Sequence, residues 1–418
     1  MAQSAVVNFA AAEGNLKTVY AGFENVLPKE YIVMKEFPFD SGNKVGDEYQ
    51  FGVELTRPHG FTTGAPGSFP LLNQPVARQV PKAKLRPYQH YLRERVTYEV
   101  LALAATSEQA AKAEMGATIQ SMRESMLFRQ EVLALYGQLG IGTFGTVTAA
   151  SNAASITSAT WAEGIWAGNE NMVLSVYTSA GVYKKDITVA TVDTQNLTIF
   201  FNAGDLNTVV ATDVIFFQGG SATTELVGIA KIIQNTGTLY NISAADYSLW
   251  KGNNFNFTTQ GASGEDLSFK RAIQLDSRIR SRGGMGDQLG LVNPDVWTTL
   301  CSNIEAARDF GGDQYKNTDI DRGTRKIRFF TPTGVTEIVA HPICKRGDFF
   351  SLRRGKWLRA GATDPTFNLP SEGGKVLFDL QDYPGKEMRI MADNTWFTPK
   401  PAASGMITNI TFGGSVSV

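Results

Sequence analysis

Residues 107–136 carry the strongest helical pattern in the sequence, and they constrain the fold more than any other stretch. They contain no proline and one glycine, Gly116, and consist mainly of residues that lose little side-chain freedom in a helix. Apolar side chains recur on one face at steps of three, four or seven residues, at Met115, Ile119, Met122, Met126 and Leu133. The pattern stops at Gly137 and Gly140. It predicts a helix roughly 45 Å long whose apolar stripe packs on a sheet; a groove for a partner helix is the alternative.

The chain before this helix is extended. Residues 1–35 contain short apolar pieces without a period, which is typical of an arm that lies on another surface. Residues 36–95 are rich in proline and glycine, with one alternating strand at 47–55 and a basic return at 80–95. An isolated two-stranded ribbon is only marginally stable in water. We therefore expect this segment to lie across a neighbouring subunit, with the basic return either a solvated hairpin face or a charge contact between subunits.

The chain after the helix changes composition. Residues 141–240 are dominated by threonine, serine, alanine, valine, asparagine and glycine, and short β runs recur about every ten residues. Runs at 172–177, 187–192, 197–201 and 213–217 predict a small β barrel or sandwich, inserted as a unit.

From about Ala244 the pattern becomes α+β. A capping box at 263–266 predicts a helix that ends at Gly283 and Gly284, and Asn293 followed by Pro294 predicts the start of a second helix. Its inner face would carry Val296, Leu300, Ile304 and Ala307. Strands are expected at 289–292, 327–330, 335–340, 348–352, 356–359, 375–380 and 387–391.

No pattern of catalytic or ligand residues is evident, so we expect no enzyme activity and no catalytic, cofactor-binding or metal site. His59, His90 and His341 are far apart and lack metal-ligand spacing, which favours satisfied or exposed imidazoles. Cys301 and Cys344 form no disulfide framework. The acidic pair within 319–321 is interpreted as a salt-bridged loop. The densest basic cluster is interpreted as a solvated or subunit-facing rim, with contact to packed nucleic acid as the alternative; it comprises Lys345, Arg346, Arg353, Arg354, Lys356 and Arg359.

The charge of the chain is low. Charged residues make up 19% and the formal net charge is −1, so little repulsion keeps copies apart. The sequence contains no basic tail, so we expect no dedicated nucleic-acid-binding segment. No signal peptide or membrane-spanning run is evident in the sequence, which favours a protein made in a cytosol.

The order of these parts resembles the major capsid proteins of tailed double-stranded DNA bacteriophages, whose fold is shared with encapsulins and the floor of herpesvirus shells. Residues 36–92 resemble the extended loop, 107–136 the spine helix, 290–300 and 337–352 the axial segments. The resemblance implies an α+β capsid fold. Its parts are an N-terminal arm (1–35), an extended loop (36–95), a peripheral domain with the spine helix (96–140), an inserted β-rich domain (141–240), and an axial domain with the return to the peripheral domain (241–418).

The resemblance further implies a structural protein that assembles as pentamers and hexamers into an icosahedral head shell. The shell would enclose double-stranded DNA without sequence-specific binding, with portal, scaffolding and decoration proteins as further partners, no membrane and no cofactor. Its location would be the virion, after assembly in the host cytoplasm. An encapsulin-like compartment and a tail or receptor-binding protein are the alternatives. The expected subunit contacts are Phe61, Phe69, Lys82, Lys84, Arg86 and Arg93.

Overall fold

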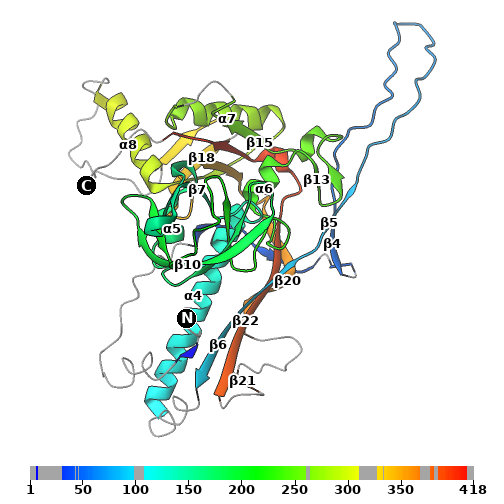
Figure 1. Ribbon diagram of the computed structural model, residues 1–418. Coiled ribbons are helices and arrows are strands. Elements are labelled where there is room, and N and C mark those ends of the chain that lie inside the picture. Colours follow the sequence, from blue (N-terminus) through cyan, green and yellow to red (C-terminus); the bar gives the residue numbers. More distant parts are fainter. Residues whose placement is uncertain are drawn as a thin grey trace.

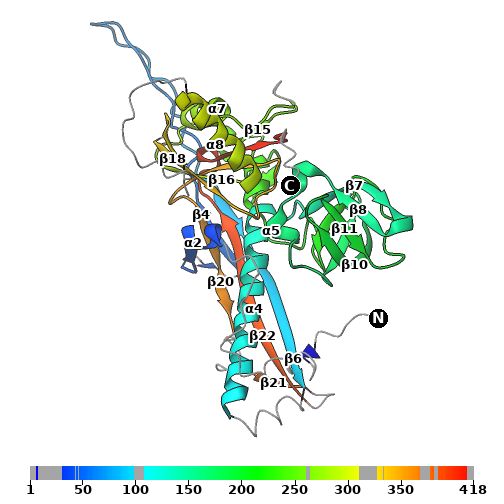
Figure 2. The same ribbon diagram turned by 90° about the vertical axis from the view of Figure 1, so that its left-hand side faces the viewer.

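The long helix and a long sheet form the spine of the molecule (Figures 1 and 2). Helix α4, Glu108–Tyr136, runs alongside strands β6 and β22, with a closed barrel on one side and a second α+β unit at its C-terminal end. The computed structural model describes residues 6–7, 31–42, 44–45, 47–97, 108–259, 264–309, 327–332, 334–367, 377–380 and 385–411.

Helix α4 confirms the predicted helix to within one residue at its start. Met122 and Met126 are buried against Met388 and Ile390, and Ile119 packs beside them. The side chain of Met115 lies outside the described residues. The last helical bond runs from Gly137 N to the carbonyl of Leu133 at 2.8 Å, and the helix ends because Gln138 and Gly140 then adopt left-handed φ values of 66° and 78°. A Cβ at Gly140 would lie 2.4 Å from the side chain of Val214, so only glycine fits this turn.

The sheet beneath α4 joins distant parts of the chain. Its order is β1-β6-β22-β20-β2, with β21 paired to β22. The longest pairing is antiparallel, between β6 and β22, and runs from Tyr88 opposite Asn394 to Thr97 opposite Gly385. The strands are β1 Val6–Val7, β2 Phe39–Asp40, β6 Tyr88–Thr97, β20 Leu358–Thr366, β21 Leu377–Asp379 and β22 Gly385–Phe397.

A closed barrel in the order β10-β11-β8-β7-β12-β9 confirms one of the two predicted forms of the region after α4. Trp161 precedes the short helix α5 (Glu163–Trp166), and Trp166 is its last residue. Both rings are fully buried and stack with their centres 6.2 Å apart. Alternating apolar residues of the strands fill the interior. The strands are β7 Gly142–Thr148, β8 Ala153–Ile156, β9 Val173–Tyr177, β10 Tyr183–Asp193, β11 Thr198–Phe201 and β12 Val214–Phe217.

The second α+β unit is a sheet covered by two helices, α7 (Phe269–Ser281) and α8 (Pro294–Asp309). Asn293 Oδ1 accepts from Asp295 N at 2.9 Å, as the Asn-Pro pattern predicts. The predicted start of α7 at 263–266 was wrong: the helix begins later, because Ser268 is its N-cap. The strand order is β15-β23-β19-β16-β18-β17. The strands are β15 Asn253–Asn256, β16 Gln288–Val292, β17 Ile327–Phe330, β18 Val335–Ala340, β19 Phe349–Arg353 and β23 Gly405–Thr408. Val296 and Leu300 of α8 are buried as predicted, and the side chains of Ile304 and Ala307 lie outside the described residues.

Shorter elements connect these units. Helix α2, Ile32–Glu36, packs on α4, and α6, Ile229–Gln234, follows the barrel. The remaining described elements are β3 Lys44–Val45, β4 Glu48–Gly52, β5 Lys82–Leu85, β13 Thr238–Leu239, β14 Ile242–Ser243 and the 3-10 turns Ala149–Ser151, Ser158–Thr160, Ser248–Trp250 and Pro401–Ala403.

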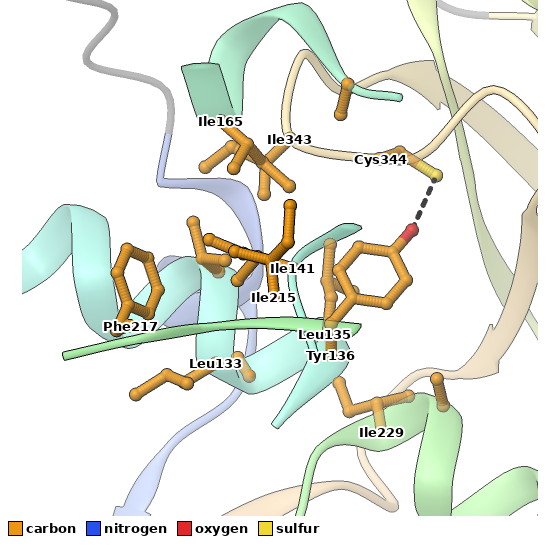
Figure 3. Close-up of a cluster of buried hydrophobic side chains, with 14 of the residues drawn as sticks. Leu133, Leu135, Tyr136, Ile141, Ile165, Ile215, Phe217, Ile229, Ile343 and Cys344 are labelled. Atoms are coloured by element: carbon orange, nitrogen blue, oxygen red, sulfur yellow. Dashed lines mark hydrogen bonds between the residues drawn. The ribbon is translucent and has the colours of Figure 1, made fainter. Parts of the chain in front are cut away.

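The C-terminal end of α4 lies in the largest apolar cluster, where the spine, the barrel and the loop after β18 meet (Figure 3). Leu133 and Tyr136 of α4 contact this cluster together with Ile215 of β12 and Ile343 of the loop. The Tyr136 hydroxyl lies 3.8 Å from Cys344 Sγ and accepts from the amide of Lys345 at 2.8 Å. These contacts fix the second α+β unit to the end of the spine helix.

The basic cluster does not form a solvated rim, so that part of the prediction was wrong, whereas its alternative of a subunit-facing rim stays a prediction. Lys345 is buried, donates to the carbonyl of Gly140 at 2.9 Å and lies 4.1 Å from the ring centre of Tyr136. Arg346 pairs with Asp295 at 2.6 Å. Arg354 pairs with Glu36 and Glu337, buried Arg359 pairs with Asp364, and Arg353 donates to the carbonyl of Asp287. Lys356 alone among the six is exposed. The acidic pair at 319–321 lies outside the described residues.

Candidate assembly surface

A small three-stranded sheet anchors the segment that the sequence predicts to contact a neighbour. Strands β3, β4 and β5 pair in that order, and alternation places Tyr49, Ala83 and Leu85 in a core with Trp250 and Phe397. Phe51 stacks on Phe397 at 4.5 Å between ring centres. The basic return at 80–95 therefore divides into two strands with different partners: β5 pairs with β4, and β6 belongs to the long sheet.

Beyond this sheet, residues 53–81 form a loop that projects far from the rest of the molecule (Figure 1). Its two arms bond to each other at the root, from Val53 N to the carbonyl of Pro81 at 3.0 Å. Farther out, His59 and Val76 exchange two backbone bonds of 2.9 Å. Near the tip, Asn73 Nδ2 donates to the carbonyl of Phe61 at 2.7 Å. Internal bonds thus give the loop a defined path without a surface beneath it.

The tip of this loop presents large apolar side chains to solvent. Phe61, Leu71 and Leu72 are 85%, 93% and 80% exposed, and Phe69 is fully exposed. Burying a side chain of this kind stabilises by about 1.5–3 kcal/mol. Residues 58–77 contain no lysine, arginine, aspartate or glutamate, so no charge opposes their burial. An exposed apolar patch on an ordered projection is typical of an interaction surface.

Charged residues gather at the root instead. Arg86 pairs with Asp47 at 3.2 Å and with Glu48 at 3.3 Å, and Lys84 pairs with Glu48 at 3.8 Å. Arg86, Asp47 and Lys84 are exposed, whereas Glu48 is half-buried, and exposed pairs contribute only about 0–1 kcal/mol. They can therefore exchange partners at low cost.

The structure separates the six expected contact residues into three places. Phe61 and Phe69 lie at the tip, whereas Lys82, Lys84 and Arg86 lie at or beside the root sheet. Arg93 lies in β6, opposite Arg389 of β22. The sequence reasoning missed Leu71 and Leu72, although the uncharged run at 58–77 is the signal that includes them.

No chemical centre emerges among the described residues. None of their histidine, cysteine, aspartate and glutamate side chains forms a group of three or more that could hold a metal ion. Burial raises the pKa of the Cys344 thiol far above its ordinary value, so this cysteine stays protonated and unreactive. In the described part of the chain, no helix is both long and apolar enough to span a membrane.

The chain matches known proteins in its fold, whereas the comparisons of its sequence found no match. No protein-family model and no curated protein matches the chain. The cyanophage A-1(L) capsid, by contrast, aligns over 94% of this chain and 96% of its own, with a TM-score of 0.59 and 11% identity. The fold is that of a phage capsid protein. This confirms the expected α+β class and, at the level of the fold, the resemblance to phage major capsid proteins.

Two further solved structures align over nearly the whole chain, at lower similarity. The capsid of cyanophage P-SCSP1u covers 94% of this chain and 91% of its own, with a TM-score of 0.47 and 10% identity. The encapsulin complex of Synechococcus elongatus PCC 7942 covers 97% and 96%, with a TM-score of 0.42 and 9% identity.

Proposed function

We propose that this chain is a structural capsid protein, many copies of which form a closed icosahedral shell around double-stranded DNA. One observation carries the proposal: a body with the capsid fold over nearly its whole length carries a projecting loop with fully exposed apolar side chains. A single copy leaves that surface in water. A shell of many copies offers each loop a neighbour.

The shell forms by contact area rather than by catalysis. Each copy would use different patches on its two sides, which closes rings of pentamers and hexamers. Stable interfaces bury more than about 1,000 Å², and several of them per copy make loss of one subunit from a closed shell very slow. The low net charge of −1 suits this close approach, because copies repel one another weakly.

The enclosed DNA would be held by confinement, without reading its sequence. Five of the six basic residues between Lys345 and Arg359 bond to groups of this same chain, which leaves little of that cluster for phosphates. Portal, scaffolding and decoration proteins are the further partners that we propose for such a shell. The protein would be made in the host cytoplasm and reside in the virion.

Electron microscopy of the purified protein, expressed alone and with its neighbouring genes, tests the proposal. The expected result is closed, angular shells of uniform diameter that contain DNA. Shells filled with protein cargo would indicate an encapsulin-like compartment instead. Small rings or trimers that never close would indicate a tail or receptor-binding protein.

A further inference from the structure

Helix α7 of the second α+β unit carries a dense group of positive charges. The segment 269–282 contains one acidic residue, Asp276, and five basic residues, Lys270, Arg271, Arg278, Arg280 and Arg282. Asp276 is buried and accepts from the hydroxyls of Thr336 and Ser351 at 2.8 Å each. Asp266 is exposed but precedes the helix. The exposed side of α7 therefore presents cations with no carboxylate of the helix between them.

Three of these cations are available to an outside partner. Lys270, Arg278 and Arg280 are exposed, and none of them forms an ion pair with a residue that the structure describes. Arg271, by contrast, pairs with Glu265 at 2.7 Å. A phosphate that approached the three unpaired side chains would break no existing ion pair. It would exchange only their water for a charge-assisted hydrogen bond.

The positive surface continues past the end of the helix. Arg282 donates to Asn253 Oδ1 at 2.8 Å, which holds it against the segment that carries the exposed Lys251. Lys400 donates to the carbonyl of Gly283 at 2.5 Å from the other side. We call the exposed side of α7 together with Lys251 and Lys400 the basic face. At 1.5 Å per residue, its helical part alone is about 20 Å long.

The basic face and the barrel lie on opposite sides of one sheet. Leu275 and Ile279 of α7 belong to the same apolar cluster as Ile407 of β23. The preceding residue of that strand, Met406, belongs to the cluster of the barrel and the spine helix. Residues 141–240 contain seven acidic and three basic residues, so the barrel side has the opposite sign of charge. A polyanion is therefore attracted to the α7 side and repelled from the barrel side.

The side chains between the cations distinguish a nucleic acid from a protein partner. Gln274, Ser277 and Ser281 are exposed on the same side of α7, and Ile273 is the one large apolar side chain of the helix that is exposed. Protein–protein interfaces have an apolar centre that is depleted in charge. Protein–DNA interfaces are polar and strongly positive, as this surface is.

We propose that the basic face of α7 binds the phosphate backbone of the enclosed DNA, independently of base sequence. This inference rests on the proposed function and names the surface that contacts the DNA. Phosphates of one strand follow one another every 3.4 Å along the duplex axis, so a helix about 20 Å long spans roughly six of them. Arginine and lysine contacts to phosphates fix the position of a duplex without reading its bases.

Photocrosslinking in DNA-filled shells tests this contact. The photoreactive residue p-benzoylphenylalanine replaces Gln274, an exposed position of α7 between Lys270 and Arg278, and the shells are irradiated. Covalent protein–DNA adducts are expected from this chain. The matched control carries the same photoreactive residue in place of Val182, which is 62% exposed on the barrel. No DNA adduct is expected from the control.

DNA-filled shells in which position 274 gives no more DNA adduct than position 182 would overturn the inference while leaving the proposed function intact. Crosslinks from position 274 to a protein in place of DNA would also overturn it, and would assign the basic face to an acidic partner protein. Shells that hold no DNA would overturn the proposed function, and this inference with it.

The salt dependence of DNA binding by the full chain gives a second measurement. Each phosphate contact contributes about 0.9 to the slope of log K against log salt concentration. Arg278→Gln combined with Arg280→Gln should therefore reduce the slope by about 2 for a short duplex of mixed sequence. Arg57→Gln combined with Lys356→Gln removes the same charge at exposed positions outside α7 and should leave the slope unchanged. Equal slopes for the two double variants would overturn the inference.

Discussion

Glu131 and His341 lie 2.9 Å apart, between Oε1 and Nε2, and both side chains are completely buried. The same carboxylate accepts from the amides of Val33 and Met34 at 2.7 and 2.9 Å, both of which lie in the first turn of helix α2. One side chain of the spine helix therefore bonds to the segment before it and to the loop after β18. Three segments far apart in sequence depend on this carboxylate for their relative positions.

Glu131→Gln should lower the free energy of unfolding by about 1–3 kcal/mol, the cost of leaving a buried partner unsatisfied. The amide keeps one acceptor oxygen, so it cannot serve Val33, Met34 and His341 together. Urea unfolding monitored by circular dichroism measures the change. Glu170→Gln, an exposed control, should unfold like the original chain. Equal stability of the two variants would contradict the role of Glu131.

Met122→Asp should give insoluble chains, because it places an unpaired carboxylate against Met388 and Ile390. Burying an unpaired charge costs several kcal/mol. The neighbouring change Arg123→Asp adds the same group on the exposed side of α4 and should remain soluble. The soluble fraction after expression measures both. A soluble, folded Met122→Asp chain would show that the stripe is not the buried face.

Deletion of residues 61–70 should leave a soluble subunit with an unchanged melting temperature, because this part of the loop is almost wholly exposed. Closed shells should be abolished. A variant that keeps the loop length but changes Phe61, Phe69, Leu71 and Leu72 to serine separates apolar contact from reach, and it should also fail to close. Normal shells from either variant, seen by electron microscopy, would rule out the tip as an assembly contact.

Glu225 should make the fold less stable as pH rises. Its folded pKa is raised from 4.5 to about 7 by burial, so the folded state holds the proton more tightly than the unfolded chain. Its stabilising contribution is complete below about pH 4.5 and is lost as pH rises through 7, by at most about 3 kcal/mol at 1.36 kcal/mol per pKa unit. Glu225→Gln should gain stability over the original chain between pH 5 and 8. A difference that does not change with pH would refute the assignment.

His90 should act in the opposite direction. Burial and nearby Arg129 lower its folded pKa from 6.5 to about 4, so the fold favours the neutral ring. The stability that His90 provides is complete above about pH 6.5 and is lost as pH falls through 4, by at most about 3 kcal/mol. His90→Phe should remove this loss, so denaturant unfolding of the variant should change less between pH 7 and 4. An unchanged acid response would contradict the prediction.

Sequence patterns predicted the helices whose position is set by interactions between residues close in the chain. The composition of residues 107–136 and the Asn293-Pro294 pair placed α4 and α8 to within a residue at their starts, because capping and helix propensity act over a few positions. The start of α7 was missed because two serines, Ser263 and Ser268, each fit a cap pattern. Only the second caps the helix, where Ser268 Oγ accepts from Arg271 N at 3.4 Å.

Long-range chemistry was not predictable in the same way. His341 and Glu131 are 210 residues apart, and Lys345 reaches Gly140 across 205 residues, so no spacing rule connects them. The solvated rim was predicted for this reason: the density of the cluster in sequence resembles a charged surface, whereas the partners of Lys345, Arg346, Arg353 and Arg354 come from other segments. The candidate assembly surface was partly predictable, because the proline and glycine content of residues 36–95 indicates a chain that does not bury itself.

The pairing of β6 with β22 also sets the timing of folding during synthesis. Met122 and Met126 are synthesised roughly 260 residues before Met388 and Ile390, the strand residues that cover them. At roughly 5–20 residues per second, translation keeps that stripe uncovered for on the order of tens of seconds. A nascent chain of this protein therefore needs protection by a chaperone, or a rapid provisional collapse, well before it can meet another copy.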